Sequence, residues 1–194
     1  MPVYQRGATQ RHQIIRDLAR RLTIFLLVAM LANASVIQVR AQTVNEYQVK
    51  AAFIFNFAKF VEWPSDAFGE GAALVVGVIG EDPFGGALDR LNGNTANGRA
   101  LRIKRFRWGD DLRACQVLFV SASEDRHLRK IMESIRGTSV LTIGESTQFS
   151  QSGGMIRFVI QDNKVRFEIN ASAAGQSGLK ISSKLLALSK RGKT

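Results

Sequence analysis

The chain has 194 residues, of which 45% are hydrophobic, and its formal net charge is +11. The length suggests one domain, or one domain plus a targeting segment, and the hydrophobic content excludes a largely disordered chain. Two histidines and one cysteine are too few for a histidine- or cysteine-based metal site or a Ser–His–Asp triad. Nothing in the sequence indicates an enzyme, and neither a metal nor a cofactor is expected.

The first 41 residues differ from the rest of the chain. Five arginines between positions 6 and 21 precede the apolar run LTIFLLVAMLA at 22–32, and small residues follow it. This order is typical of a secretory signal peptide, and the run is shorter than the roughly 20 residues of a membrane-spanning helix. Cleavage is expected after Ala41 or, as a second choice, after Ala34; an uncleaved anchor is the rival interpretation. Residues 1–41 are thus assigned to a signal peptide and 42–194 to one domain.

The remaining charge is moderate. Six arginines and one aspartate lie within residues 1–41, which leaves a net charge of +6 for residues 42–194. An exported protein rarely meets nucleic acid, so an anionic membrane surface, a cell-wall polymer or a phosphorylated small molecule is a better candidate partner. A solvated basic surface that aids solubility explains the same charge.

A helix is predicted between residues 43 and 64. Thr43 and Glu46 fit a capping box at its start, and Pro64 disfavours helical geometry at Trp63, which marks its end. Apolar residues at i, i+3 and i+4 spacing form one face. These residues are Ala51, Ile54, Phe57, Ala58 and Val61.

More aromatic residues cover other sides of the same helix. They are Phe53, Phe55 and Phe60. Polar residues interrupt the apolar surface too often for a membrane span. They are Lys50, Asn56, Lys59 and Glu62. A helix that is apolar on most sides is usually buried on several of them. Either the fold surrounds this helix, or part of it meets another chain.

The rest of the chain alternates between predicted strands and helices. Strands are predicted at 72–80, 101–108, 115–121, 139–144 and 179–181, and a hairpin at 155–170. Helices are predicted at 86–91, 123–137, 171–177 and 182–191, and a loop at 92–99. This alternation, which ends in a hairpin, predicts an α/β fold: a single three-layer domain with a mixed β-sheet flanked by helices.

Several residues have predicted local roles. Ser123 is expected to cap the helix at 123–137, and Gly137 to end it. Its core stripe consists of Leu128, Ile131, Met132 and Ile135. Asp162 and Asn163 supply the hairpin turn, and Asn170 is expected to cap the helix after the hairpin.

Two features have a structural and a functional interpretation. Cys115 begins an apolar strand, so a buried inert thiol is expected, with an intermolecular disulfide as the alternative. The stretch GVIGEDPFGG follows a strand and is rich in glycine, but it lacks the spacing of a phosphate-binding loop. A turn between a strand and a helix is the simpler interpretation, although ligands of α/β sheets often bind at such strand ends.

Four stretches in order resemble the YfiR family of exported bacterial proteins. They are YQVKAAFIFNFAKFVEWP, CQVLFVSAS, the segment from VLTIGES to GGMIRFVI, and the segment from NKVRFEINASAA to GLKISSKLL. The resemblance covers about residues 46 to 188. The N-F-x-K-F-V-x-W-P helix end is its most specific part, together with F-E-I-N and K-I-S-S-K-L-L.

The resemblance implies a periplasmic α/β regulator that is often a homodimer. Relatives bind the periplasmic part of an inner-membrane diguanylate cyclase and hold it inactive, which limits cyclic di-GMP and biofilm formation; some bind small molecules. Lys180 and Ser182 match positions that help to bind ligand in a relative. The motif residues are candidates for partner binding. They are Asn56, Phe57, Phe60, Trp63, Pro64 and Asn170. Cys115 matches one cysteine of a relative's disulfide, but the second cysteine is missing, so an intramolecular disulfide is not expected.

Two functions remain after this comparison. The first is repression of a membrane diguanylate cyclase by a binding protein without catalytic activity. The alternative is a periplasmic module that binds a small ligand and feeds a sensor kinase or other membrane receptor. A third possibility, an envelope enzyme, is opposed by the lack of an acid–base or nucleophile constellation.

Overall fold

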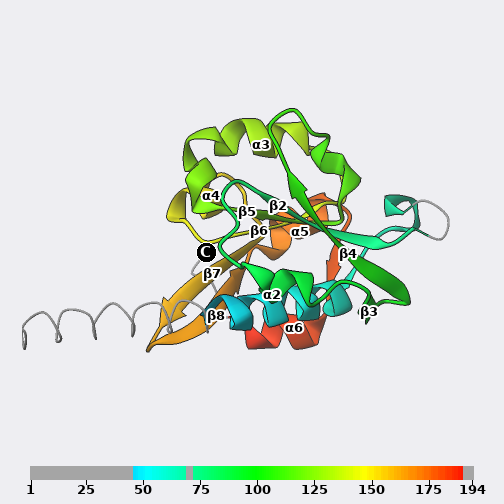
Figure 1. The fold of residues 1–194 in the computed structure, drawn as a ribbon, viewed down its shortest axis with the longest axis horizontal. Helices are drawn as coiled ribbons and strands as arrows, with labels where there is room; N and C mark the ends of the chain where they lie inside the picture. Colours follow the sequence, from blue (N-terminus) through cyan, green and yellow to red (C-terminus); the bar gives the residue numbers. More distant parts are fainter. Residues whose placement is uncertain (1–45, 69–71, 190–194) are drawn as a thin grey trace, which may run out of the picture. The chain divides into compact units, whose positions relative to one another are not determined.

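The computed structural model describes residues 46–68 and 72–189 (Figure 1). The predicted signal peptide and the proposed cap at Thr43 lie outside the described residues. No helix within the described residues has both the length and the apolar content needed to cross a membrane.

Within the described residues, the main sheet has seven strands in the order β3-β4-β2-β5-β6-β7-β8. The strands are β2 (Leu74–Ile79), β3 (Thr95–Ala96), β4 (Arg99–Phe106), β5 (Val117–Val120), β6 (Leu141–Gly144), β7 (Ile156–Gln161) and β8 (Lys164–Ile169). The five strands from β4 to β7 are parallel, whereas β3 and β8 add antiparallel edges. This strand order is that of a doubly wound sheet, and it confirms the predicted mixed sheet.

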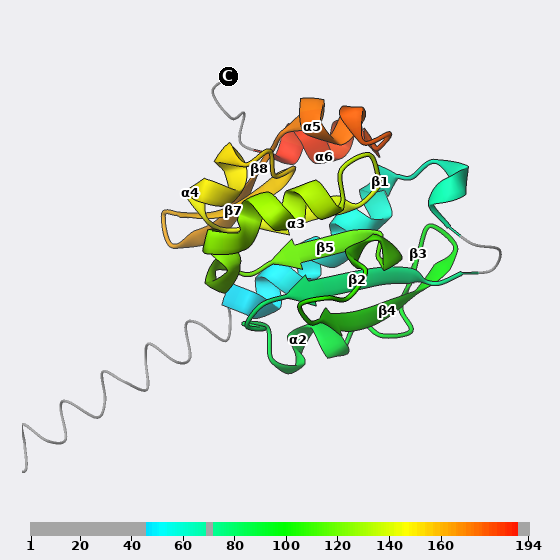
Figure 2. The ribbon, with the colours of Figure 1, turned by 90° about the horizontal axis from the view of Figure 1, so that it is seen from above.

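Helices cover both faces of the sheet, as the two views show (Figures 1 and 2). The predicted first helix, here named the aromatic helix, occupies residues 46–60. It lies on one face with α2 (Gly86–Asp89), α5 (Ala171–Gln176) and α6 (Ser183–Leu188). The opposite face carries α3 (Leu128–Ser134) and α4 (Thr147–Gln151). The prediction of three layers is therefore confirmed.

Short elements connect these layers. They are β1 (Val61–Glu62), β9 (Lys180–Ile181) and the 3₁₀ turns η1 (Ser65–Ala67), η2 (Leu112–Ala114) and η3 (Ala122–His127). Strand β1 follows the aromatic helix directly and pairs with β9 in a separate two-stranded ladder. The ladder joins the end of the first helix to the start of the last.

The predicted apolar face of the aromatic helix is confirmed. Its five residues are between 0 and 2% exposed. At its centre, the ring centroid of Phe57 lies 5.8 Å from that of Phe158 and 5.0 Å from that of Phe167. Phe53, Phe55 and Phe60 are partly buried against the same core. The exposed side is a narrow stripe, which consists of Gln48, Val49, Ala52, Asn56 and Lys59.

The predicted end of this helix is wrong. The helix stops at residue 60, and the chain becomes extended in β1 before it reaches Pro64. Two interactions with distant segments favour the early end: β1 pairs with β9, and the Asn97 side chain donates to the carbonyl oxygens of Ala58 and Val61. Because both partners are far away in sequence, proline punctuation alone could not locate this boundary.

The predicted helix at 123–137 has a different start and end. Its first residues form the 3₁₀ turn η3, and α3 ends at Ser134, before Gly137. The capping side chain is Ser121, whose hydroxyl accepts from the N–H of Ser123 at 3.4 Å. The predicted core stripe is confirmed: three of its residues are at most 6% exposed, and Met132 packs against them.

The hairpin prediction is confirmed. Strands β7 and β8 pair antiparallel, and the turn residues Asp162 and Asn163 have φ angles of 49° and 56°. Asn170 caps α5 by accepting from the N–H of Ala173 at 3.0 Å, as predicted. Helix α4 was not predicted, and the predicted loop at 92–99 contains the short strand β3.

A prediction follows from the packing of Phe149. An ideal Cβ built on Gly154 would lie 2.2 Å from a carbon of the Phe149 ring, whereas one on Gly175, inside α5, would meet nothing within 4 Å. Gly154→Ala should therefore lower the free energy of unfolding by about 1–3 kcal/mol. Gly175→Ala is the matched control and should raise it by about 0.5–1 kcal/mol, because alanine favours the helix. Denaturant unfolding measures both changes. Equal stabilities of the two variants would contradict the close packing of Phe149 against Gly154.

Candidate functional site

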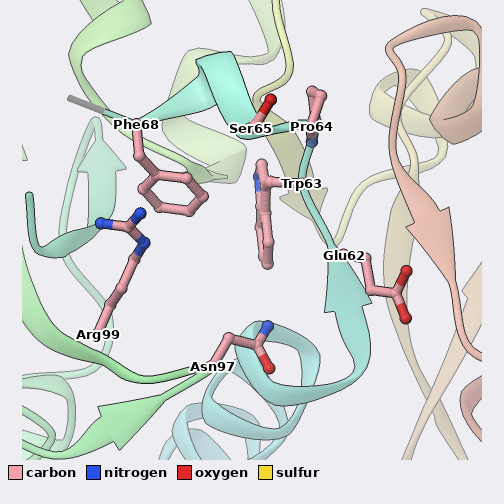
Figure 3. Close-up of a pocket in the computed structure, with 7 residues that line it drawn as sticks. All are labelled: Glu62, Trp63, Pro64, Ser65, Phe68, Asn97 and Arg99. Carbon is pink, nitrogen blue, oxygen red and sulfur yellow. The ribbon is translucent and has the colours of Figure 1, made fainter. Parts of the chain in front are cut away.

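A pocket of about 300 Å³ lies at the end of the aromatic helix (Figure 3). We name it the Trp63 pocket. It is lined by Glu62, Trp63, Pro64, Ser65, Phe68, Asn97 and Arg99. The first five follow the helix through β1 and η1, whereas Asn97 lies in the turn between β3 and β4 and Arg99 is the first residue of β4. Two segments that lie almost thirty residues apart in sequence therefore form the pocket together.

Aromatic rings and one guanidinium form the centre of this pocket. The rings of Trp63 and Phe68 meet edge to face, with their centroids 6.2 Å apart. The guanidinium carbon of Arg99 lies 4.1 Å from the centroid of Phe68, which is a cation–π contact. Arg99 Nη1 also donates to the carbonyl oxygen of Ala72 at 2.7 Å. These contacts hold the cation beside an apolar wall.

Hydrogen bonds fix the walls of the pocket. The amide of Asn97 donates to the carbonyl oxygens of Ala58 at 3.0 Å and Val61 at 2.9 Å. These carbonyls have no helical partner at a helix end, so the amide acts as a cap. Asn97 adopts a positive φ of 50°, which asparagine tolerates better than most residues. Trp63 Nε1 donates to the carbonyl oxygen of Gln116 at 3.3 Å.

A second hollow of about 550 Å³ adjoins the first and shares Asn97 and Arg99 with it. Arg102 adds another guanidinium to its lining. An apolar pocket beside two arginines can hold a molecule or a peptide segment that carries an apolar body and an anionic group. Among the described residues, Glu62 provides the only carboxylate in the lining of the two hollows.

The structure brings the two predicted ligand residues close to this end of the aromatic helix. Lys180 lies opposite Glu62 in the β1–β9 ladder, and it is exposed. Ser182 follows directly after this strand, and its N–H donates to the carbonyl oxygen of Phe60 at 3.0 Å. Its hydroxyl accepts from the N–H of Leu185 at 3.2 Å, which makes Ser182 the cap of α6. Neither residue lines the Trp63 pocket itself.

The motif residues have different positions. Trp63 and Pro64 line the pocket, and the ring of Phe60 lies 5.4 Å from Nζ of Lys184. Asn56 is exposed on the aromatic helix, one turn before Phe60, whereas Phe57 is fully buried. Phe57 therefore acts in core packing in this structure. Asn170 lies elsewhere, between β8 and α5.

A charged cluster at the start of the aromatic helix was missed by sequence reasoning. Lys50 is only 3% exposed, and its ammonium binds Glu46 and, at 2.9 Å, Glu145. It also lies 4.3 Å from the ring centroid of Tyr47, whose hydroxyl donates to Glu145 at 3.1 Å. Burial and the Glu145 carboxylate raise the pKa of Tyr47, so the phenol remains a donor. The spacing of Glu46 and Lys50 is a signal for one pair, but Glu145 is distant in sequence.

The glycine-rich stretch at 77–86 forms a turn between a strand and a helix. Gly80 has a φ of 91°, and an ideal Cβ there would lie 2.5 Å from Oγ of Ser123. That hydroxyl accepts from the N–H of Glu81 at 3.0 Å. Ser123 therefore occupies the space beside Gly80, where a doubly wound sheet often binds ligand. The described residues contain no group of acidic, histidine or cysteine side chains that could hold a metal ion.

Cys115 is buried, as predicted, with 1% of its surface exposed. Its Sγ lies 3.2 Å from the carbonyl oxygen of Leu112 and donates to it. Burial raises the pKa of this thiol to about 12. A protonated thiol without access to solvent is a poor nucleophile, so the geometry favours the inert thiol over an intermolecular disulfide.

A family model described as YfiR/HmsC-like matches residues 47–190 of the chain. The match begins in the aromatic helix and extends beyond α6. It includes the Trp63 pocket and both predicted ligand residues.

Asn97 provides a test of how the Trp63 pocket is built. Asn97→Asp replaces the amide donor with a carboxylate that faces two carbonyl oxygens, and it should lower the free energy of unfolding by about 1–3 kcal/mol at neutral pH. The loss should shrink as the pH falls toward about 4, because the two carbonyl oxygens raise the pKa of the new acid in the folded protein and the protonated acid can donate. Asn97→Gly keeps the positive φ and removes only the hydrogen bonds, so its loss should be smaller and independent of pH. Denaturant unfolding across pH measures this; an undiminished stability of Asn97→Asp would contradict the capping role.

Cys115 should be unreactive while the protein is folded. A maleimide added at pH 8 should label almost none of the native protein and all of it in denaturant, because burial keeps the thiol protonated. Above the ordinary thiol pKa of about 8.5, the free energy of unfolding should fall with pH, because the unfolded chain releases this proton first. Cys115→Ser is the control for the pH effect. Rapid labelling of the native protein would contradict the burial.

Proposed function

The chain belongs to the YfiR/HmsC-like family, and from that premise we propose that it is a periplasmic regulatory binding protein that represses an inner-membrane diguanylate cyclase. It thereby limits cyclic di-GMP and biofilm formation. The observation that carries the proposal is the family match over residues 47–190, which spans the whole α/β fold from the aromatic helix to α6. The protein contributes binding energy and no catalytic step.

The location is part of the proposal. Residues 1–41 act as a signal peptide that is cleaved after Ala41, and the domain from residue 42 onward works in the periplasm. There it meets the periplasmic domain of the cyclase. Binding to that domain then controls, across the membrane, the synthesis of cyclic di-GMP by the cyclase.

Repression follows from a difference in affinity. If the protein binds the inactive state of the periplasmic domain more tightly than the active one, it shifts the population toward the inactive state. Each tenfold difference in affinity for the two states changes the free-energy difference between those states by about 1.4 kcal/mol. A signal that weakens the complex returns the cyclase to its own equilibrium. Because Cys115 is buried and alone, that signal does not act through an internal disulfide of this chain.

The layer of the aromatic helix supports a docking surface for the cyclase. Five large hydrophobic side chains are exposed within the described residues, and four of them lie on elements of this layer or on the adjoining hairpin. The four are Val49, Ile160, Leu186 and Leu188. Exposed apolar side chains that gather on one side of a protein often mark a binding surface. The exposed stripe with Asn56 crosses the same layer.

The Trp63 pocket supports a second candidate function. A periplasmic module that binds a small ligand and feeds a sensor kinase or other membrane receptor needs a concave site. The aromatic walls and the Arg99 guanidinium provide one. Lys180 is exposed nearby and adds a second cation to that end of the helix.

Deletion of the gene tests the first function. Intracellular cyclic di-GMP should rise in the deletion strain and return to the parental level when the wild-type gene is supplied. Complementation with Asn56→Arg should fail, because the substitution puts a bulky charge on the exposed stripe. Lys130→Glu, on the opposite face in α3, is the control and should complement fully. Unchanged cyclic di-GMP under several growth conditions would refute repression of a cyclase.

A thermal-shift screen of the purified protein separates the two functions. Nucleotides, amino acids and cell-wall fragments are the probes. A ligand that raises the melting temperature of the wild type but not of Arg99→Ala would support the ligand-binding module. The absence of any shift would leave repression by direct binding as the sole candidate.

A further inference from the structure

The lining of the Trp63 pocket combines an apolar wall with polar side chains. Trp63 and Phe68 are partly buried, so their rings form the wall of a hollow and do not protrude. Figure 3 shows the indole of Trp63 edge-on, with Phe68 and Arg99 on the same side of it. The class of ligand that fits this lining depends on which of its hydrogen-bonding groups are unused.

Both guanidinium groups of the two hollows have unused donors. Arg99 binds the carbonyl oxygen of Ala72 through Nη1, and its Nε and Nη2 donate to no residue that the structure describes. These two nitrogens form one edge of the planar guanidinium, and such an edge binds a carboxylate at two points. Arg102 is exposed in the adjoining hollow and has no hydrogen bond or ion pair within residues 46–68 and 72–189. Each of the two arginines can therefore bind one carboxylate.

The same lining contains three side chains whose oxygen atoms are unused acceptors. The amide nitrogen of Asn97 donates to Ala58 and Val61, whereas its amide oxygen accepts no hydrogen bond from the described part of the chain. The side chains of Glu62 and Ser65 are exposed and also have no partner there. A ligand that fills the pocket must therefore supply hydrogen-bond donors as well as an anionic group.

We propose that the Trp63 pocket and the adjoining hollow bind an acidic saccharide. A sugar ring has a face of C–H groups, which packs on the rings of Trp63 and Phe68, and a rim of hydroxyl groups, which both donate and accept. The carboxylate of the sugar binds Arg99, and its hydroxyls donate to the three unused acceptors. This inference rests on the ligand-binding function proposed above for the pocket, and it is independent of cyclase repression.

Other classes of ligand leave part of the lining unpaired. An aromatic acid without hydroxyl groups would cover the apolar wall and bind Arg99, but it would leave the acceptors without donors, which costs binding energy. A small anion such as phosphate would leave the aromatic rings uncovered. A membrane surface cannot enter a hollow of about 300 Å³ to reach these rings.

The adjoining hollow of about 550 Å³ indicates that the ligand has more than one sugar unit. Because Asn97 and Arg99 line both hollows, a chain that leaves the first hollow passes Arg99 and continues toward Arg102. The rest of the second lining is small and leaves room for a ring; it consists of Ala72, Ala73, Gly98 and Ala100. A saccharide with a carboxylate on each of two successive units would meet one guanidinium per unit.

Two sources supply this chemistry, and Arg102 separates them. Polyuronates carry a carboxylate on every sugar, whereas the glycan of the cell wall carries one on alternate sugars, in N-acetylmuramic acid. A diuronate should therefore bind both Arg99 and Arg102. The disaccharide of N-acetylglucosamine and N-acetylmuramic acid should bind Arg99 alone.

Isothermal titration calorimetry of the protein, purified as the cell processes it, tests the class of ligand. The acidic probes are galacturonate, digalacturonate and the cell-wall disaccharide, and their neutral counterparts are galactose, galactobiose and chitobiose. At least one acidic disaccharide should bind, and its neutral counterpart should bind about tenfold more weakly or less, because it cannot form the charged hydrogen bonds. Added salt should weaken the binding of the acidic probe.

Two variants locate the carboxylates. Arg99→Gln should weaken the binding of every acidic probe about tenfold or more. Arg102→Gln alters an exposed side chain without partners in the described residues, so the fold should be unaffected. It should reduce the affinity for digalacturonate to that for galacturonate and leave the cell-wall disaccharide unchanged. Lys130→Gln removes the same charge on α3 and is the matched control. Circular dichroism checks that each variant is folded.

Three outcomes would overturn the proposal. The first is a neutral saccharide that binds as tightly as its acidic counterpart. The second is an acidic saccharide whose binding neither Arg99→Gln nor Arg102→Gln weakens. The third is the absence of any saccharide with a dissociation constant below about 1 mM.

The same titrations distinguish failure of this inference from failure of the ligand-binding function. If no saccharide binds but an aromatic amino acid does, and Arg99→Gln abolishes that binding, the pocket binds ligand of another class and only the saccharide is refuted. If no probe of either class binds, both are refuted. Neither result bears on the cyclic di-GMP level of the deletion strain.

Discussion

The contact of Phe57 with Phe158 and Phe167 is the interaction on which the rest of the structure depends. It fixes the aromatic helix on the sheet, and the neighbouring apolar residues of that helix are almost completely buried around it. The helix then presents its last turn to Asn97 and to the β1–β9 ladder, so its position determines where the Trp63 pocket lies. The same rings hold one face of β8 against the helix.

The two ends of the aromatic helix have different chemistry, although one element supports both. At the first end, Lys50 is buried between two carboxylates, an arrangement that is costly to disturb because removal of one partner leaves an unpaired charge. At the other end, an aromatic pocket lies open beside Arg99. In a protein that binds through one region, the buried ion pairs at one end of the helix keep the fold intact while the pocket at the other end stays open for contact. The proposed docking surface also lies on this layer or on the adjoining hairpin.

Local patterns predicted the parts of the fold that depend on local physics. The 3.6-residue spacing identified the buried face of the aromatic helix, and alternation identified the hairpin of β7 and β8. Distant contacts decided the rest: the helix ends before Pro64 because β9 and Asn97 bind its last residues, and Lys50 is buried because Glu145 reaches it. For the site, Trp63 and Pro64 were identified by the family motif. Asn97 and Arg99 were missed because the sequence shows only a turn there.

The long sequence separation of these contacts has a consequence for biogenesis. The aromatic helix is the first described element, yet part of the surface that buries it comes from β7, β8 and α6, near the other end of the chain. Because contacts between distant segments form late and slowly, the helix lacks the β7, β8 and α6 side of its core until residues 156–185 have been synthesised. Complete folding of such a chain is therefore delayed. For a protein proposed to be exported, this order of elements places the completion of the core at the end of synthesis.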